Sequence, residues 1–163
     1  MHIVLVHPQI PHNTGVIGRL CVNLGATLHL IKPLGFDISD KAVKRAGLDY
    51  WPKLDVNVWE SLEEYLRKYP IGEHTFLATT KTQRPYFEAA MPQDAHLLFG
   101  SETAGLPESL LRAHPKQCIT LPMKPEGRSL NLAMSVAVVA YDVVRQNFES
   151  FGEQKTIPFK ERV

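Results

Sequence analysis

The sequence has few cysteines and almost no net charge, and each shortage argues against a class of protein. Cys21 and Cys118 are the only cysteines among 163 residues, and neither belongs to a Cys-x-x-Cys pair. This rules out a zinc ribbon and argues against a disulfide-based scaffold. Eighteen basic and 17 acidic residues leave a formal net charge of +1, which excludes a generically DNA-coating protein. Any contact with nucleic acid must come from a local cluster of basic side chains.

The sequence also lacks a segment that could cross a membrane or direct export. The longest nearly apolar stretch, from Leu130 to Tyr141, is interrupted by Asn131 and Ser135. A helix that spans a bilayer needs roughly 20 residues, so we expect no membrane contact. The N-terminal segment MHIVLVHPQ has no charged region or cleavage pattern and predicts a first strand rather than a signal peptide. These features favour a cytoplasmic protein.

Several motifs of common enzyme classes are missing as well. The sequence contains no P-loop, no Gly-x-Gly-x-x-Gly after a strand and no Gly-x-Ser-x-Gly elbow. Its seven histidines form no His-Glu-x-x-His or His-x-x-x-His pair. Kinase, hydrolase, classical Rossmann and metalloenzyme interpretations therefore lack support, and we expect no metal.

Apolar and polar segments alternate in the way that is typical of α/β proteins. Strands are predicted at 3–6, 28–31, 55–59, 75–79, 96–99 and 118–121, and helices at 13–24, 40–45, 61–69, from 107 and at 129–148. This alternation predicts a mostly parallel sheet covered by helices on both faces. Ligands of such sheets bind at the carboxyl ends of the strands. The loops after Val6, Thr79, Phe99 and Leu121 are therefore the candidate sites.

The first predicted helix carries glycines on the side opposite its apolar face. Asn13 is its expected N-cap, and Gly25 is its expected C-terminal stop. Gly15, Gly18 and Arg19 share one stripe, although a glycine inside a helix costs about 1 kcal/mol relative to alanine. The stripe indicates that something approaches this backbone closely beside Arg19. Helix packing over small residues is the alternative.

Two later loops join a buried strand to a helix. The loop at 100–107 has one carboxylate, Glu102. Three roles are open for it: to accept a hydrogen bond from a hydroxyl, to fix the loop, or to cap the next helix. The loop from Leu121 contains two prolines and enters the last helix at Arg128 and Ser129, with Ser129 as the expected N-cap. In that last helix, residues at helical spacing are either core or an oligomer face: Leu132, Val136, Val139 and Val143.

One local cluster of basic residues surrounds two aromatic ones. Lys41, Lys44, Arg45 and Lys53 lie around Tyr50 and Trp51 in the sequence. Interleaved cations and aromatics suit phosphate contacts and base stacking. A solvated helix face above two buried aromatic residues explains the pattern equally well.

In this order, the loops resemble the three motifs of the SPOUT (α/β-knot) RNA methyltransferases. The closest likeness is to the small stand-alone tRNA 2′-O-methyltransferases that modify the wobble nucleotide. The motifs are residues 13–15 with 19, residues 99–103 with 105–107, and residues 121–123 with 128–132. Further matches lie at 29–36 and 45–50, and the resemblance runs from about residue 3 to 146.

The chain length predicts a single domain over residues 1–163, and the polar sequence from Ser150 predicts a loosely held tail at 150–163. The resemblance implies a deep trefoil knot at about 75–149. It implies S-adenosylmethionine bound in the knot, with S-adenosylhomocysteine as the product. The positions that match the family's cofactor residues are Ala78, Thr79, Gly100, Glu102, Leu121, Met123, Ser129, Leu130 and Asn131.

The same resemblance implies a homodimer that methylates the 2′-hydroxyl of nucleotide 34, a cytidine or a cmnm5-type uridine, in the anticodon stem-loop of tRNA. Arg19, Asn13 and Tyr141 match catalytic or supporting positions, and Arg19 would act on cofactor held by the partner chain. RNA contacts are expected from Lys41, Lys44, Arg45 and Arg128.

Three alternatives stay open at this point. One keeps the fold but methylates another RNA nucleotide, and another is a small nucleotide-binding protein without an RNA partner. The third is a knotted RNA-binding module without turnover, because Ala133 and Met134 stand where close relatives often carry polar residues.

Overall fold

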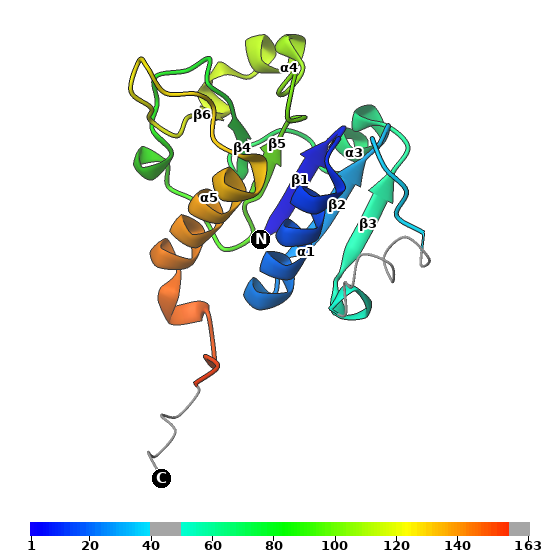
Figure 1. Cartoon of the computed structure of the whole chain (residues 1–163). Helices are drawn as coiled ribbons and strands as arrows, with labels where there is room; N and C mark the ends of the chain where they lie inside the picture. Colours follow the sequence, from blue (N-terminus) through cyan, green and yellow to red (C-terminus); the bar gives the residue numbers. More distant parts are fainter. Residues whose placement is uncertain (40–49, 157–163) are drawn as a thin grey trace.

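The computed structural model describes residues 1–39 and 50–156, and this part contains one six-stranded parallel sheet (Figure 1). Its strands are β1 (His2–Val6), β2 (Thr27–Ile31), β3 (Val56–Trp59), β4 (Thr75–Ala78), β5 (His96–Phe99) and β6 (Cys118–Ile119). They lie in the order β3-β2-β1-β5-β4-β6, and every neighbouring pair is parallel. The predicted fold class, a mostly parallel α/β sheet, is confirmed.

Helices cover both faces of this sheet. They are α1 (Pro11–Leu24), α3 (Leu62–Lys68), α4 (Glu108–Ala113) and α5 (Leu132–Gln146), with short 3-10 turns η1 (Trp51–Lys53), η2 (Tyr86–Glu88), η3 (Pro115–Gln117) and η4 (Phe148–Ser150). The α1 and α5 helices lie side by side on one face (Figure 1). In β1, Ile3 and Leu5 pack on that side, whereas Val4 and Val6 pack with α3 and α4. Alternate strand residues point to opposite faces, so both faces need apolar residues.

Two predicted helix N-caps are wrong, and in each case the predicted capping side chain does not bond to the start of its helix. The α1 helix begins at Pro11, whose fixed backbone suits a first helical position, so Asn13 lies inside the first turn and caps nothing. The α5 helix begins after Asn131, whose side-chain oxygen accepts from the backbone N–H groups of Ala133 and Met134. Ser129 is therefore not the N-cap. Gly25 ends α1 in a left-handed conformation with φ 61°, as predicted.

The α5 helix has two separate apolar faces. The residues predicted as core or oligomer face are buried against the sheet and α1: Leu132, Val136, Val139 and Val143. A second stripe, at the spacing of three and four residues, is exposed to solvent. It consists of Met134, Val138 and Tyr141, which are 59%, 40% and 53% exposed. The first face is core, and the second is an apolar surface without a partner among the described residues.

Three histidines pack together on the face that α3 covers. The rings of His2 and His96 stack with centroids 4.1 Å apart, and His2 Nδ1 lies 3.0 Å from His29 Nε2. Trp59 Nε1 donates to His29 Nδ1 at 3.1 Å, and the Tyr65 hydroxyl lies 2.5 Å from His96 Nδ1. Burial lowers the pKa of His29 to about 3 and the pKa of His96 to about 4. The cluster is therefore uncharged at neutral pH.

Parts of the expected organisation fall outside the residues described. The helix predicted at 40–45 lies there, as do residues 157–163 of the predicted tail. The single domain over 1–163 and the tail at 150–163 stay predictions.

Candidate active site

A cleft of about 460 Å³ lies where β4, β5 and β6 end, in the size range of small-molecule sites. It is the place at which an α/β sheet is expected to bind a ligand. All nine residues predicted to hold a cofactor line this cleft: Ala78, Thr79, Gly100, Glu102, Leu121, Met123, Ser129, Leu130 and Asn131. Asn13, from the first turn of α1, lines it too. Loops far apart in the sequence thus build one site.

One wall of the cleft is the tight loop after β5. A side-chain carbon on Gly100 would lie 1.8 Å from the carbonyl carbon of Gly105 and 2.0 Å from the nitrogen of Leu106. The loop closes on itself through a bond from Gly105 N to Ser101 O at 2.9 Å, and Gly105 has φ 70°. The backbone fold of this wall therefore requires glycine at position 100.

The segment at 121–131 also lines the cleft and has many unused backbone groups. Among the described residues, the only backbone N–H in 121–130 that donates within the chain is that of Gly127, to Lys124 O at 2.8 Å. The apolar side chains of Met123 and Leu130 are 39% and 42% exposed. Free backbone donors beside apolar side chains suit a ligand with a polar, planar base.

Glu102 connects the second loop to the first. Its carboxylate accepts from the backbone N–H groups of Gln9 and Ile10 at 2.8 and 3.1 Å, and from Asn13 Nδ2 at 3.0 Å. Partial burial acts to raise the pKa of Glu102, but these hydrogen bonds outweigh it and lower the pKa below its usual value. Of the three roles left open by the sequence, fixing the loop is the one the geometry supports, since the cap of the next helix has no side-chain bond.

Asn13 and Asn131 extend this connection to the third loop. Asn131 Nδ2 donates to Asn13 Oδ1 at 2.9 Å, while Asn131 Oδ1 caps α5. The path Glu102–Asn13–Asn131 therefore joins residues that are 89 and 118 positions apart. We call it the Asn13 network. It fixes the three loops of the cleft relative to one another.

Arg19 does not line this cleft. Its side chain is exposed on α1, and the guanidinium carbon lies 5.2 Å from the ring centroid of Tyr50. The Tyr50 hydroxyl donates to the carbonyl oxygen of Gly15. A side-chain carbon on Gly18 would lie 3.3 Å from the Tyr50 ring and 3.1 Å from Leu54. The close approach predicted from the glycine stripe is real, and a segment of this same chain makes it.

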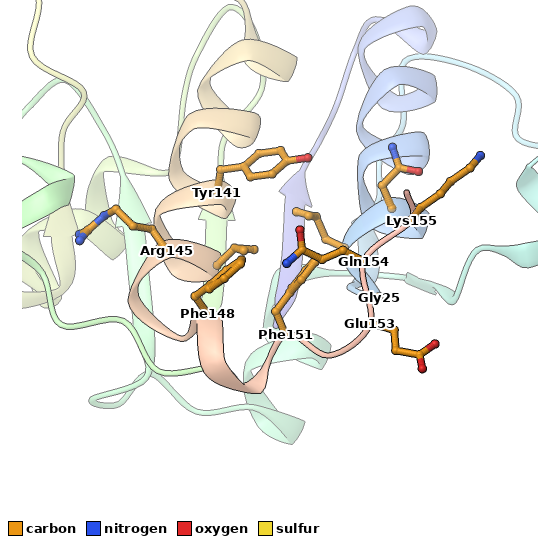
Figure 2. A pocket seen from close by; sticks show the side chains of 11 residues that line it. Gly25, Tyr141, Arg145, Phe148, Phe151, Glu153, Gln154 and Lys155 are labelled. Atoms are coloured by element: carbon orange, nitrogen blue, oxygen red, sulfur yellow. The ribbon is translucent and has the colours of Figure 1, made fainter. Parts of the chain in front are cut away.

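Tyr141 lies at a second, wider hollow of about 1150 Å³ (Figure 2). Figure 2 shows Tyr141, Arg145 and Phe148 on the α5 side and the Gln154 and Lys155 backbone on the α1 side. None of the nine predicted cofactor residues lines it. Tyr141 thus belongs to the exposed face of α5 and not to the wall of the cleft.

The residues predicted to contact RNA are only partly placed. Arg128 is exposed in the loop at 121–131 and does not line the cleft. Lys41, Lys44 and Arg45 lie outside the described residues. Trp51 packs partly buried against the core, which favours the interpretation of these aromatics as packing residues.

Sequence reasoning missed one charged residue of the cleft, Lys81. It bonds to Glu108 at 2.9 Å, and Glu108 also binds Arg112. Hydrogen bonds from Lys81 and then Arg112 lower the pKa of Glu108 to about 2. The signal for Lys81 was its place two residues beyond the strand predicted at 75–79, which in the structure ends at Ala78.

Two further observations concern what the described residues do not contain. No group of three or more histidine, cysteine, aspartate or glutamate side chains in 1–39 and 50–156 could hold a metal ion. In the same ranges, no helix is both long enough and apolar enough to pass through a bilayer.

Comparison with known proteins places these features in a family. Residues 1–141 match the model of the SpoU rRNA Methylase family. The tRNA (cytidine(34)-2′-O)-methyltransferase of Aeromonas hydrophila is 44% identical over 147 residues, which are 90% of this chain and 94% of the relative.

Solved structures agree with this assignment. One solved structure, described as giving insights into "the 2-OH methylation of C/U34 on tRNA", matches with a TM-score of 0.83 and 41% identity. This match covers 91% of this chain and 96% of the solved chain. The SpoU methyltransferase AviRb of Streptomyces viridochromogenes, in complex with AdoMet, matches with a TM-score of 0.75 and 25% identity. This match covers 91% of this chain and 58% of the AviRb chain. The shared fold implies the trefoil knot that the sequence resemblance predicts. With its three motif loops gathered at one cleft, the chain belongs to the SpoU rRNA methylase family.

Proposed function

We propose that this protein transfers the methyl group of S-adenosylmethionine to the 2′-hydroxyl of nucleotide 34 in the anticodon stem-loop of tRNA. The nucleotide is a cytidine or a cmnm5-type uridine, and the reaction takes place in the cytoplasm. The observation that carries the proposal is the convergence of all nine predicted cofactor residues at one cleft. The relatives named for 2′-O-methylation of cytidine 34 support the choice of nucleotide.

The residues of the cleft fit the cofactor. Exposed Met123 and Leu130 offer apolar contact for an adenine ring, and the unused backbone N–H groups of 121–130 offer donors. Gly100 lets the loop after β5 fold tightly into the cleft wall, because any side chain there would clash with the backbone of Gly105 and Leu106. When bound, S-adenosylmethionine supplies an electrophilic methyl group. The nine residues hold it, and the Asn13 network keeps their three loops in place.

Arg19 orients the ribose hydroxyl and stabilises the charge that develops on its oxygen. Guanidinium groups keep their proton in proteins, so Arg19 donates hydrogen bonds and does not act as a base. A phosphate of the RNA accepts the hydroxyl proton. Correct alignment of the two reacting groups supplies much of the rate enhancement. Asn13 lines the cleft and completes the site.

The active unit is a homodimer. Arg19 does not line the cleft of its own chain. The Arg19 that acts on the reacting hydroxyl at one cleft therefore comes from the second copy of the chain. The exposed stripe Met134, Val138 and Tyr141 on α5, with Val16 of α1 47% exposed, gives an apolar surface for that copy. Apolar patches of this kind mark interaction sites. Arg128 and the cluster at Lys41, Lys44 and Arg45 supply phosphate contacts across the two chains.

Mass spectrometry of tRNA tests the reaction directly. Purified protein is incubated with S-adenosylmethionine and tRNA from a strain that lacks the gene, and nucleotide 34 is analysed for a 2′-O-methyl group. Methylation at 34 supports the proposal, and methylation at another nucleotide contradicts it. Calorimetry that shows no S-adenosylmethionine binding would instead indicate an RNA-binding module. The side chains of Ala133 and Met134, which raised that alternative, do not line the cleft.

Subunit complementation tests the shared site. Arg19→Ala, which removes the guanidinium, and Gly100→Ala, whose added carbon would lie 1.8 Å from the carbonyl carbon of Gly105, each disable every site of their own homodimer. A mixture of the two variants forms heterodimers in which one site is intact if Arg19 serves the partner's cleft. We expect activity to return to about a quarter of wild type on mixing, and no return would contradict the shared site.

A further inference from the structure

Tyr50 meets Arg19 on the surface of α1, and the family match assigns no role to this contact. The Arg19 guanidinium carbon lies 5.2 Å from the centroid of the Tyr50 ring, within the distance of a cation–π interaction. Arg19 is exposed, and a long exposed side chain samples many rotamers unless a neighbour restricts it. The ring restricts this freedom on one side.

The Tyr50 ring is itself fixed from two directions. Its hydroxyl donates to the carbonyl oxygen of Gly15, one helical turn before Arg19. The ring edge packs close to position 18, because a side-chain carbon there would lie 3.3 Å from it, tighter than an ordinary van der Waals contact. Position 18 is glycine, so the ring lies directly on the helix backbone. Gly18 lowers the stability of the helix by about 1 kcal/mol relative to alanine, but it allows the Tyr50 ring to pack against the helix.

The segment after Tyr50 anchors the ring to the core. The η1 turn closes with bonds from Lys53 N to Tyr50 O at 2.9 Å and from Leu54 N to Trp51 O at 3.1 Å. Leu54 is buried at 8% exposure, and Trp51 packs partly buried on the same core. Tyr50 thus begins a hydrogen-bonded turn whose next residues pack on the core.

We propose that Tyr50 is a positioning residue that holds the Arg19 guanidinium in the orientation used on the ribose hydroxyl. This inference rests on the proposed function for its catalytic consequence, but the restraint on Arg19 does not. A preorganised guanidinium loses less entropy when it binds the hydroxyl, so the benefit falls on turnover. Cofactor binding, at a cleft that Tyr50 does not line, is unaffected.

The first test is independent of activity. Nitrogen-15 relaxation of the Arg19 Nε–H group is measured in the wild type, Tyr50→Phe and Tyr50→Leu, with circular dichroism as a check of folding. We expect an ordered Arg19 Nε in the wild type and in Tyr50→Phe, and a mobile one in Tyr50→Leu. Equal mobility in all three proteins would overturn the proposal, whatever reaction the protein catalyses.

The second test measures methylation kinetics. Tyr50→Leu should lower kcat about fivefold, as the loss of one cation–π contact allows, and leave KM for S-adenosylmethionine unchanged. Tyr50→Phe should retain most activity. In an Arg19→Gln background, where residue 19 carries no cation, the Tyr50→Leu effect should shrink, whereas Trp51→Leu, which alters the same turn, should act additively with Arg19→Gln. Additivity for Tyr50 as well would overturn the positioning role.

Discussion

The Nδ2 group of Asn131 donates to Oδ1 of Asn13 at 2.9 Å, so the start of the last helix is bonded to the first turn of the first helix. Asn13 in turn donates to Glu102. Each asparagine uses both ends of its amide, because Asn131 Oδ1 also caps α5. The cleft loops are therefore held by partly buried side chains whose hydrogen-bonding groups satisfy one another.

Asn131→Asp separates the two roles of Asn131. Aspartate still caps α5 but has no donor for Asn13, and it places a second carboxylate near Glu102. We expect S-adenosylmethionine affinity to fall about tenfold, in line with the loss of one partly buried hydrogen bond, while stability changes little. Asn131→Ala should lose about 1 kcal/mol of stability in addition, from the missing cap. Calorimetry and urea unfolding measure the two effects, and unchanged affinity in Asn131→Asp would contradict the role of the network.

Gly100→Ala should abolish the cleft. The added carbon would lie 1.8 Å from the backbone of Gly105, so the loop wall must move. We expect loss of S-adenosylmethionine binding together with a lower melting temperature. Gly72→Ala is the matched control, because its added carbon has no neighbour closer than 4.0 Å. Normal binding in Gly100→Ala would show that the wall is not needed.

Glu102→Gln should weaken the contact between the second loop and α1. A glutamine amide has one acceptor oxygen, so one of the three N–H donors at this site would face an NH2 group. We expect a loss of about 2 kcal/mol in the free energy of unfolding, typical of hydrogen bonds to a charged group. Glu73→Gln, at an exposed position, is the control. Equal stability of the two variants would argue against the contact.

The histidine cluster predicts a fall in stability with acid. Burial lowers the pKa values of His2, His29 and His96 in the folded protein, whereas unfolded histidines bind protons near pH 6.5. Between about pH 6.5 and 4 the unfolded state therefore holds more protons, and the free energy of unfolding decreases as pH falls. The urea midpoint should be lower at pH 5.0 than at pH 7.5. His29→Leu should reduce this pH dependence, and an unchanged slope would refute the assignment.

Val138→Glu should convert the proposed dimer to monomers. It places a charge in the middle of the exposed α5 stripe, and an unpaired buried charge is strongly unfavourable in an interface. Analytical ultracentrifugation should show monomers with native circular dichroism and little methylation. Val58→Glu, at an equally exposed valine of β3, should remain dimeric. A dimeric Val138→Glu would place the interface elsewhere.

The sequence predicted the fold class and the cleft residues because both depend on local patterns. Buried strands of a parallel sheet need mostly apolar runs. Segments rich in apolar residues mark every strand of the described sheet within two residues of its ends, although the edge strand β3 includes Asn57 and is only partly buried. The carboxyl ends of parallel strands meet at one edge, so the loops after β4, β5 and β6 had to lie together. The motif resemblance then assigned these loops a chemistry.

The sequence could not predict which side chains pair across the fold. Asn13 and Ser129 are both good N-cap residues by type, yet Pro11 and Asn131 define where the two helices begin. Likewise, nothing local connects Tyr50 to Gly15 and Arg19, because residues 31 to 35 positions away meet only when the η1 turn packs on α1. Local propensity determined the elements of this protein. Their packing alone decided the Asn13 network and the contact at Arg19, because a hydrogen bond or ring contact forms only between groups that the tertiary fold brings within reach.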